Sequence, residues 1–287
     1  MSSRIECIKP ITPPGAASFT RVRCRRCGPC RVRNKMAWTG RLLAESTGYS
    51  ASRVVTLTYA DPADQYSDLN YKHIQDFLKI HRQETNEHTR YFVCGEFGSE
   101  SGHAHWHMVL FGEQSWQPEF RKKAVFCDLR GWTDVHGFAS CMRLVPETAA
   151  YTCGYTLKKG KNLTPFLRCS LKPSISFTQI DCYSEQVFRR YGQKPIPVPS
   201  WWVFNGKKYP LNDGAARRFK QSYLKLGGRL EHKPKWLIKL ETDAYHRSEE
   251  YFSEETNVML KRDAERTLNG TTIKEKTAQQ AAGSWRI

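Results

Sequence analysis

Two histidines and a glutamate are spaced so that they could bind one metal ion. In the run HAHWH (103–107), His105 and His107 alternate, and alternate residues of a strand point to one face. Imidazoles about 6–7 Å apart can converge on an ion, and Glu96 on a neighbouring strand could add a carboxylate oxygen. His103 has the same parity and stays a candidate ligand, although it falls in a glycine-flanked turn. The alternative is a pair of half-exposed strand histidines that bind nothing.

Two tyrosines one helical turn apart could attack a phosphodiester. Tyr151 and Tyr155 share a helix face by their spacing, and Lys158 and Lys159 follow one turn further on. A tyrosine oxygen is a competent nucleophile when a cation lowers the cost of its ionisation. The phosphotyrosine ester keeps the energy of the broken bond, so the break can be resealed, and two tyrosines would allow two transfers. The alternative is an aromatic pair packed in the core.

Three cysteines are spaced for a tetrahedral zinc site. Cys24, Cys27 and Cys30 form a tight C-x2-C-x2-C run, and Cys7 is the nearest candidate for the fourth ligand. Redox chemistry and unmetallated cysteines are the alternatives. The arginines around this run predict DNA contacts, with a solvated basic face as the alternative; they are Arg21, Arg23, Arg25, Arg26, Arg31 and Arg33.

Strands and helices must position these residues. Runs of β-branched and apolar residues predict strands at 53–59, 91–96 and 105–111, and the last two are expected to form a hairpin. Apolar residues at helical spacing predict helices at 34–46, 70–84 and 146–159. Pro146 and Gly160 suit the two ends of the last helix.

Composition suggests three parts along the chain. They are a basic, cysteine-rich segment with a helix (1–53), a central core (54–195) and a C-terminal extension (196–287). The proline-rich connector at 195–199 marks the second boundary. Within the extension we expect a basic helix at 215–226 and a largely helical stretch at 236–269.

The charge distribution indicates a polyanionic partner. Lys and Arg number 45 against 28 Asp and Glu in 287 residues, a formal net charge of +17. Residues 1–53 hold eleven basic and two acidic residues, a net +9, whereas residues 241–287 hold seven and nine, a net −2. An excess of this size favours nucleic acid, because each neutralised phosphate releases condensed counterions. A merely soluble basic surface is the alternative.

The cysteine content bears on the compartment. Ten cysteines in this length are too sparse for a disulfide-stapled secreted scaffold. No apolar signal-peptide segment follows Met1 and no run of 18 apolar residues occurs, so we expect no membrane partner. We therefore expect reduced thiols in a cytoplasm.

Taken in order, the motifs resemble those of rolling-circle replication initiators, the HUH endonucleases. The matching runs are VVTLTY (54–59), GEFGSESGHAHWHMVLFG (95–112) and AAYTCGYTLKK (149–159). The similarity is closest to the initiators of gokushovirus-type microviruses, in which a CxxCxxCR element comes first, here CRRCGPCR (24–31). KPSIS (172–176) stands where that family often has a KPGIG-like element, with serines in place of glycines. The resemblance covers roughly residues 7–205.

The resemblance implies a fold and an activity. The fold is α+β, with a central antiparallel sheet that carries the paired histidines and with helices on its faces. The activity is site-specific nicking of the origin of a small circular single-stranded DNA phage. His105, His107 and Glu96 would hold Mg²⁺ or Mn²⁺, and Tyr151 or Tyr155 would attack to form a 5′-phosphotyrosine.

The resemblance also implies partners. These are single-stranded origin DNA and the host polymerase and helicase, in the cytoplasm of a bacterial host. Lys158 and Lys159 are candidates for phosphate contacts, and the strand with Thr56 and Thr58 is expected beside the metal-binding strand. Trp106 and Tyr59 could stack unpaired bases, although core packing explains Trp106 equally well. The competing functions are a non-catalytic zinc-knuckle DNA-binding protein and a relaxase or transposase of another mobile element.

Overall fold

One antiparallel sheet forms the centre of the molecule. The computed structural model describes residues 7–12, 14–15, 22–60, 69–86, 88–98, 102–112, 124–155 and 166–231. The strands of the sheet are β1 (Ser52–Tyr59), β2 (Arg90–Phe97), β3 (Ala104–Phe111), β4 (Val125–Phe126), β5 (Gly137–Arg143) and β6 (Phe166–Cys169). They lie in the order β4-β5-β1-β3-β2-β6, and every neighbouring pair is antiparallel. The three predicted strands and the predicted hairpin are confirmed.

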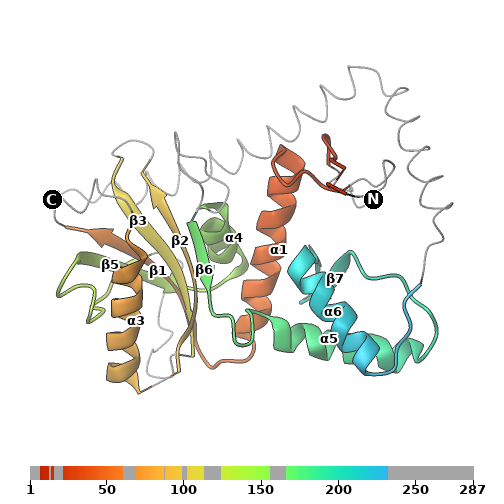
Figure 1. The fold of residues 1–287 in the computed structure, drawn as a ribbon. Coiled ribbons are helices and arrows are strands. Elements are labelled where there is room, and N and C mark those ends of the chain that lie inside the picture. Colours follow the sequence, from red (N-terminus) through yellow and green to blue (C-terminus); the bar gives the residue numbers. More distant parts are fainter. Residues whose placement is uncertain are drawn as a thin grey trace.

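Helices cover both faces of this sheet. Those of the described residues are α1 (Gly28–Ser46), α3 (Tyr71–Thr85), α4 (Pro146–Tyr155), α5 (Phe177–Tyr191) and α6 (Asp213–Lys225). Helix α3 lies on one face, and α1 and α4 lie on the other (Figure 1). Helices α5 and α6 pack together beyond α1, beside a second hairpin of β7 (Trp201–Phe204) and β8 (Lys207–Pro210). The predicted α+β class is confirmed.

The alternation of side chains along each strand builds two cores. Val55 and Trp106 are buried on the α3 face, and Val54 and Val109 are buried on the α1 and α4 face. Because both faces are covered, the central strands are apolar over most of their length. Four polar residues lie together at one end of the α4 face, where the candidate site lies: Thr56, Thr58, His105 and His107.

Helix α1 begins earlier than the sequence predicted. It starts at Gly28 instead of residue 34, with Pro29 in its first turn and Cys30 buried. Proline suits this position because its missing N–H is not needed there. The last part of the cysteine run is therefore helical, and the first turn of α1 carries one of the candidate zinc ligands.

Buried charges fix the KPSIS loop (172–176) against α1. Glu45 on α1 accepts from Arg90 Nε at 2.7 Å and from the backbone N–H of Ser176 at 2.5 Å, and both charged side chains are buried. Arg41, one turn earlier on α1, donates to the backbone oxygen of Ile175 at 2.7 Å. Ser176 has a φ of 67°, in the region that glycine favours. These contacts hold the loop at Ser176 in this conformation.

We expect Arg90→Met to destabilise the protein strongly. The change leaves the Glu45 carboxylate buried without its charged partner, which costs about 3–5 kcal/mol of unfolding free energy. The matched control is Arg130→Met, because Arg130 pairs with Glu84 at the surface, where such a pair contributes about 1 kcal/mol or less. Thermal unfolding followed by circular dichroism measures both, and equal losses in the two variants would contradict the role of the buried pair.

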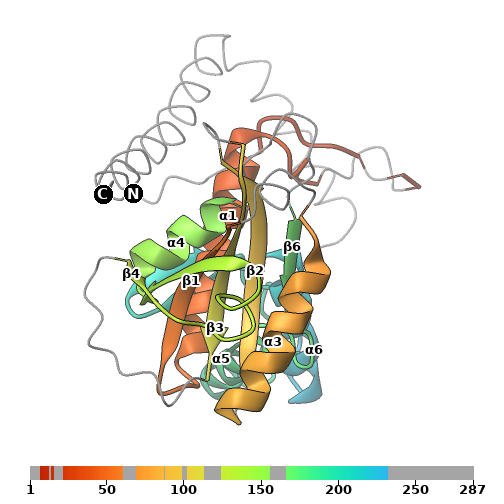
Figure 2. The same ribbon diagram turned by 90° about the vertical axis from the view of Figure 1, so that its left-hand side faces the viewer.

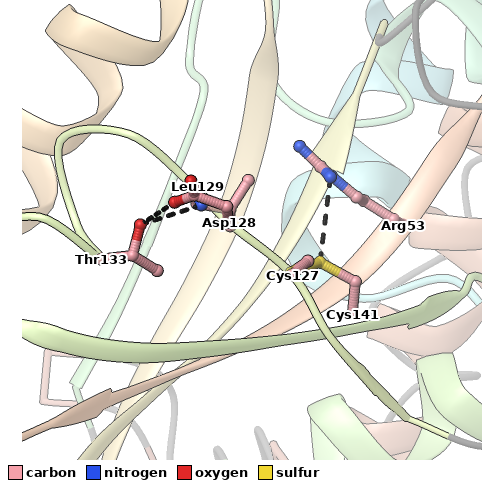
Figure 3. Close-up of a disulfide and its surroundings, with 6 residues drawn as sticks. All are labelled: Arg53, Cys127, Asp128, Leu129, Thr133 and Cys141. Atoms are coloured by element: carbon pink, nitrogen blue, oxygen red, sulfur yellow. Dashed lines mark hydrogen bonds between the residues drawn. A yellow bond between two sulfur atoms is a disulfide. The ribbon is translucent and has the colours of Figure 1, made fainter.

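The expectation that all cysteines are reduced is wrong at one pair. Cys127 and Cys141 form a disulfide, with their Cα atoms 6.2 Å apart (Figure 3). Cys141 lies on β5 and Cys127 directly follows β4, so antiparallel pairing brings the two thiols together. Arg53 also contacts the Cys141 sulfur, at 3.8 Å (Figure 3). The bond ties the short strand β4 to the sheet.

Other expectations fall partly outside the described residues. The predicted helix at 70–84 is confirmed as α3, and that at 215–226 as α6. The helix predicted at 146–159 is confirmed as far as Tyr155, whereas residues 156–160 and the stretch at 236–269 lie outside the described residues. The division into three parts stays a prediction. No described helix is long and apolar enough to cross a membrane.

Candidate active site and cysteine cluster

Strand β3 presents both predicted histidines on the face that α4 covers. The register pairs His107 with Thr56 of β1, and Thr56 Oγ1 lies 3.2 Å from His107 Nδ1. The second pair repeats this geometry, with Thr58 Oγ1 3.3 Å from His105 Nδ1. A hydroxyl at Nδ1 helps to orient each ring, and when Nδ1 donates to that hydroxyl, Nε2 is the nitrogen that can bind an ion. The predicted neighbourhood of the threonine strand and the histidine strand is confirmed.

Glu96 lies close to both histidines. It stands directly opposite His105 in the register of β2 and β3, and its Oε1 lies 3.2 Å from His107 Nε2. Both side chains of that contact are buried. Two imidazoles and one carboxylate on one sheet face are a donor set that suits Mg²⁺ or Mn²⁺ when phosphate oxygens and water complete the coordination.

The two tyrosines of α4 stand against His107. The Tyr155 ring stacks flat on His107, with centroids 3.6 Å apart and an interplanar angle of 1°. The Tyr151 ring meets His107 edge-on at 6.0 Å and meets Tyr155 at 4.8 Å. Tyr155 is 2% exposed, whereas Tyr151 is half-buried. The two phenols therefore share one site but differ in their access to solvent.

Thiols close to the tyrosines serve packing. Cys153 lies on α4 between the two tyrosines in sequence, and burial raises its pKa to about 12. Cys94 lies opposite His107 on β2, and burial raises its pKa well above the ordinary value. A thiol that stays protonated at neutral pH is a poor nucleophile. These two buried thiols are therefore poor candidates for the nucleophile of this cluster.

The structure decides the role of two aromatic residues. Trp106 and Tyr59 are 0% and 1% exposed, on the α3 face of the sheet. The Trp106 indole N–H donates to the Tyr59 hydroxyl at 2.9 Å. The expectation that they stack unpaired bases is therefore wrong, because DNA cannot reach these rings, and core packing is their role.

For three predicted site residues the described structure gives no test. Lys158 and Lys159 lie outside the described residues. His103 precedes β3 in the turn, where its carbonyl oxygen accepts from the Gly98 N–H at 2.8 Å. Its place as a metal ligand stays a prediction.

The four N-terminal cysteines come together at the start of α1. The sulfur atoms of Cys7, Cys24, Cys27 and Cys30 all lie within 4.8 Å of one another. Burial raises the pKa of the Cys24 thiol, but hydrogen bonds from the backbone N–H groups of Arg26 and Cys27 outweigh this effect. The resulting pKa is about 6, below the ordinary value for a thiol. A thiolate beside three other thiols is the donor set of a structural zinc site. The cluster can hold zinc, and it includes Cys7, which comes from a separate segment.

Two of the predicted DNA-binding arginines contact the protein itself. Arg25 forms an ion pair with Asp213 of α6. Arg33 donates to the backbone oxygen of Ser200 at 3.0 Å and lies over the Trp201 ring. Burial and the nearby charge of Arg23 lower the pKa of Arg33 to about 10. Arg25 and Arg33 thus connect the region around the cysteine run to α6 and to the β7–β8 hairpin.

The remaining predicted DNA-binding arginines differ from one another in their exposure to solvent. Arg23 and Arg26 are exposed beside the cysteine cluster, and Arg31 is half-buried on α1. Arg21 lies outside the described residues. Exposed guanidinium groups can contact phosphates directly. Arg23 and Arg26 are exposed enough for such contacts, and the DNA-binding role of these arginines stays a prediction.

Comparison with known proteins places this site in a known context. The family of replication-associated proteins of the ORF2 type matches residues 52–160. This stretch begins at the first residue of β1 and includes both histidines, Glu96 and both tyrosines. The resemblance to microvirus replication initiators is confirmed.

Two phage proteins similar to this chain extend the comparison. Replication-associated protein VP4 of Bdellovibrio phage phiMH2K is 27% identical over 244 residues, which are 75% of this chain and 69% of that protein. Replication-associated protein ORF4 of Chlamydia phage 1 is 29% identical over 100 residues, which are 33% of this chain and 24% of that protein. No solved structure matches the chain. The first alignment is longer than the matched family region, so the similarity to a phage replication protein is not confined to the site.

Proposed function

We propose that this chain is the replication initiator of a small circular single-stranded DNA phage and that it nicks the origin with a tyrosine nucleophile. The observation that carries the proposal is the contact of Tyr155 and Tyr151 with His107, at ring distances of 3.6 and 6.0 Å. Core packing alone does not require a stack on a histidine that also contacts Glu96. The printed names of the two relatives support a role in DNA replication.

The proposed step exchanges one ester for another. A tyrosine oxygen attacks the scissile phosphorus, the bond from phosphorus to the 3′ oxygen breaks, and a 5′-phosphotyrosine remains. The phenolic proton is lost to solvent, and the departing 3′ oxygen gains a proton to become a free hydroxyl. Because the ester keeps the energy of the broken bond, the same site can rejoin the strand without ATP.

The side chains of the site divide the work. His105, His107 and Glu96 are the residues that would hold Mg²⁺ or Mn²⁺, and a bound ion would polarise a phosphoryl oxygen and offset its charge. Thr56 and Thr58 orient the two imidazoles through Nδ1. Helix α4 sets the phenols against the histidine face, so that binding of DNA need only place the phosphate.

The surroundings of this step are proposed from the same function. Lys158 and Lys159 follow the tyrosines closely and are proposed to contact the phosphates of the bound strand. The free 3′ hydroxyl would prime a host polymerase, with a host helicase opening the duplex, in the cytoplasm of the bacterial host. The cysteine cluster would bind structural zinc and present Arg23 and Arg26 to the origin.

Nicking of supercoiled origin DNA tests the proposal. With Mn²⁺ the protein should convert the supercoiled plasmid to the open circle and remain linked to DNA on a denaturing gel, and EDTA should prevent both. The Tyr151→Phe, Tyr155→Phe double variant should give no adduct while it still binds single-stranded DNA. Absence of a nick and an adduct with the unaltered protein would reject the nickase and leave a non-catalytic DNA-binding protein.

A further inference from the structure

Two exposed aromatic rings lie on the same sheet face as the candidate active site. Phe126 of β4 is 80% exposed and Phe138 of β5 is 58% exposed. Large apolar side chains with such exposure lose the free energy that burial would give them. Neither the sequence motifs nor the proposed chemistry uses these rings, so their position needs its own explanation.

The strand register relates both rings to the histidines. Phe126 stands opposite Ser140 of β5, Ser140 stands opposite Thr56, and Thr56 stands opposite His107. Directly opposed residues of an antiparallel pair point to the same face. Since neighbouring strands are about 4.8 Å apart, Phe126 lies roughly 14 Å from the His107 position along this row.

A second row leads from Phe138 to the other histidine. Phe138 stands opposite Thr58, and Thr58 stands opposite His105. The row places Phe138 roughly 10 Å from the His105 position. Gly137, the residue before Phe138, allows the start of β5 to pack closely against the end of β1, because a Cβ there would lie 2.4 Å from the Ala60 nitrogen. The two rows run across the sheet from the histidines to the β4 edge.

Strand β4 is the outermost strand on the β5 side of the described sheet, and it is held in place. Helix α4 packs over β1, β2 and β3 on this face (Figure 2). The disulfide between Cys127 and Cys141 ties the residue after Phe126 to β5 (Figure 3). The Phe126 ring therefore stands on a fixed backbone beside the site, and not on a free loop.

We propose that Phe126 and Phe138 form a stacking platform for unpaired bases of the DNA strand next to the scissile phosphate. The occupant is single-stranded DNA, because bases stack on exposed aromatic rings without regard to sequence and because the chain carries a net charge of +17. Two rings on adjacent strands, beside the polar Ser140, are too small a patch for a standard protein interface of about 800 Å² a side. The inference rests on the proposed function, since it places the strand that is cut.

Binding of single-stranded DNA without cleavage tests the platform. Fluorescence anisotropy without added Mg²⁺ or Mn²⁺ measures the dissociation constant for an oligothymidylate of about 16 nucleotides. The Phe126→Ala, Phe138→Ala double variant should bind on the order of tenfold more weakly or worse. The Phe126→Leu, Phe138→Leu variant should lose the same affinity, because it keeps an apolar surface without a ring, and the Phe126→Tyr, Phe138→Tyr variant should keep it within about twofold.

Matched controls separate the platform from the nickase. Leu171→Ala removes another exposed apolar side chain and should leave the affinity unchanged. Leu171 is 72% exposed and lies between the end of β6 and the KPSIS loop. The double tyrosine variant should also bind normally, so a failure of nicking alone would not touch this result. Unchanged affinity of the alanine variant, an equal loss from Leu171→Ala, or a changed oligomeric state with normal DNA binding would each overturn the platform.

Discussion

Tyr151→Phe is expected to abolish the first cleavage of origin DNA, and Tyr155→Phe is expected to leave it in place. Tyr151 is half-buried at the site, whereas the Tyr155 ring is 2% exposed beneath its stack on His107. A phosphodiester can therefore reach the Tyr151 oxygen first. Loss of an attacking nucleophile costs on the order of 10³-fold or more in rate, whereas phenylalanine at 155 keeps an aromatic ring for the stack.

Transfer of a labelled DNA fragment to the protein distinguishes the two variants. Because the protein links to the 5′ phosphate, an oligonucleotide labelled at its 3′ end carries the label into the protein band of a denaturing gel. Tyr155→Phe should form this adduct within about tenfold of the normal rate but fail to complete a second transfer. Tyr191→Phe is the control, since this phenol is 42% exposed on α5, away from the site. Equal losses in the two site variants, or loss confined to Tyr155→Phe, would refute the order.

Cys30→Ser is expected to remove zinc from the protein and to release the N-terminal segment from α1. Cys30 is 5% exposed and its sulfur belongs to a cluster in which all four sulfur atoms lie within 4.8 Å. Structural zinc contributes about 10–16 kcal/mol of binding free energy in small zinc-dependent folds, so even a fraction of this dominates the stability of a short segment. Loss of one thiolate leaves an incomplete tetrahedral site.

Elemental analysis and limited proteolysis measure this effect. The unaltered protein, purified with a reducing agent, should hold one zinc ion per chain, and Cys30→Ser should hold none and be cut near its N-terminus. Cys182→Ser is the matched control, because Cys182 is an exposed free cysteine on α5. A metal-free unaltered protein, or a Cys30→Ser variant that retains zinc, would show that the four cysteines are not a zinc site.

Local pattern was enough to predict the elements that carry the site. The β-branched run at 53–59 and the alternation around His105 and His107 each specify a strand, and α3 follows from apolar residues at helical spacing. Strand parity also placed both histidines on one face. The stack of Tyr155 on His107 was not predictable, because it depends on how α4 lies against α1 and the sheet.

The elements that were missed had weaker or unused signals. Helix α5 follows Ser176, which has a left-handed conformation and makes no side-chain cap, so no usual start signal precedes the helix. The β7–β8 hairpin turns at Asn205 and Gly206, both with positive φ, and Asn-Gly between apolar runs is a strong hairpin signal that could have found it. The disulfide depends on the pairing of β4 with β5, which sequence spacing does not specify.

Helix α1 has a consequence for how such a gene can change. One continuous core joins sheet residues such as Phe92 to Trp202, Tyr209 and Phe219 across this helix. At Gly40 the contact is so close that a Cβ would lie 2.5 Å from the Tyr209 ring. A recombination event that exchanged only the stretch with the histidine and tyrosine motifs would place a new sheet and a new α4 against the old α1. The packing surfaces of α1 and of the new stretch would then not match. Successful exchange between phages should therefore carry the coding sequence from the cysteine run to α6 as one block.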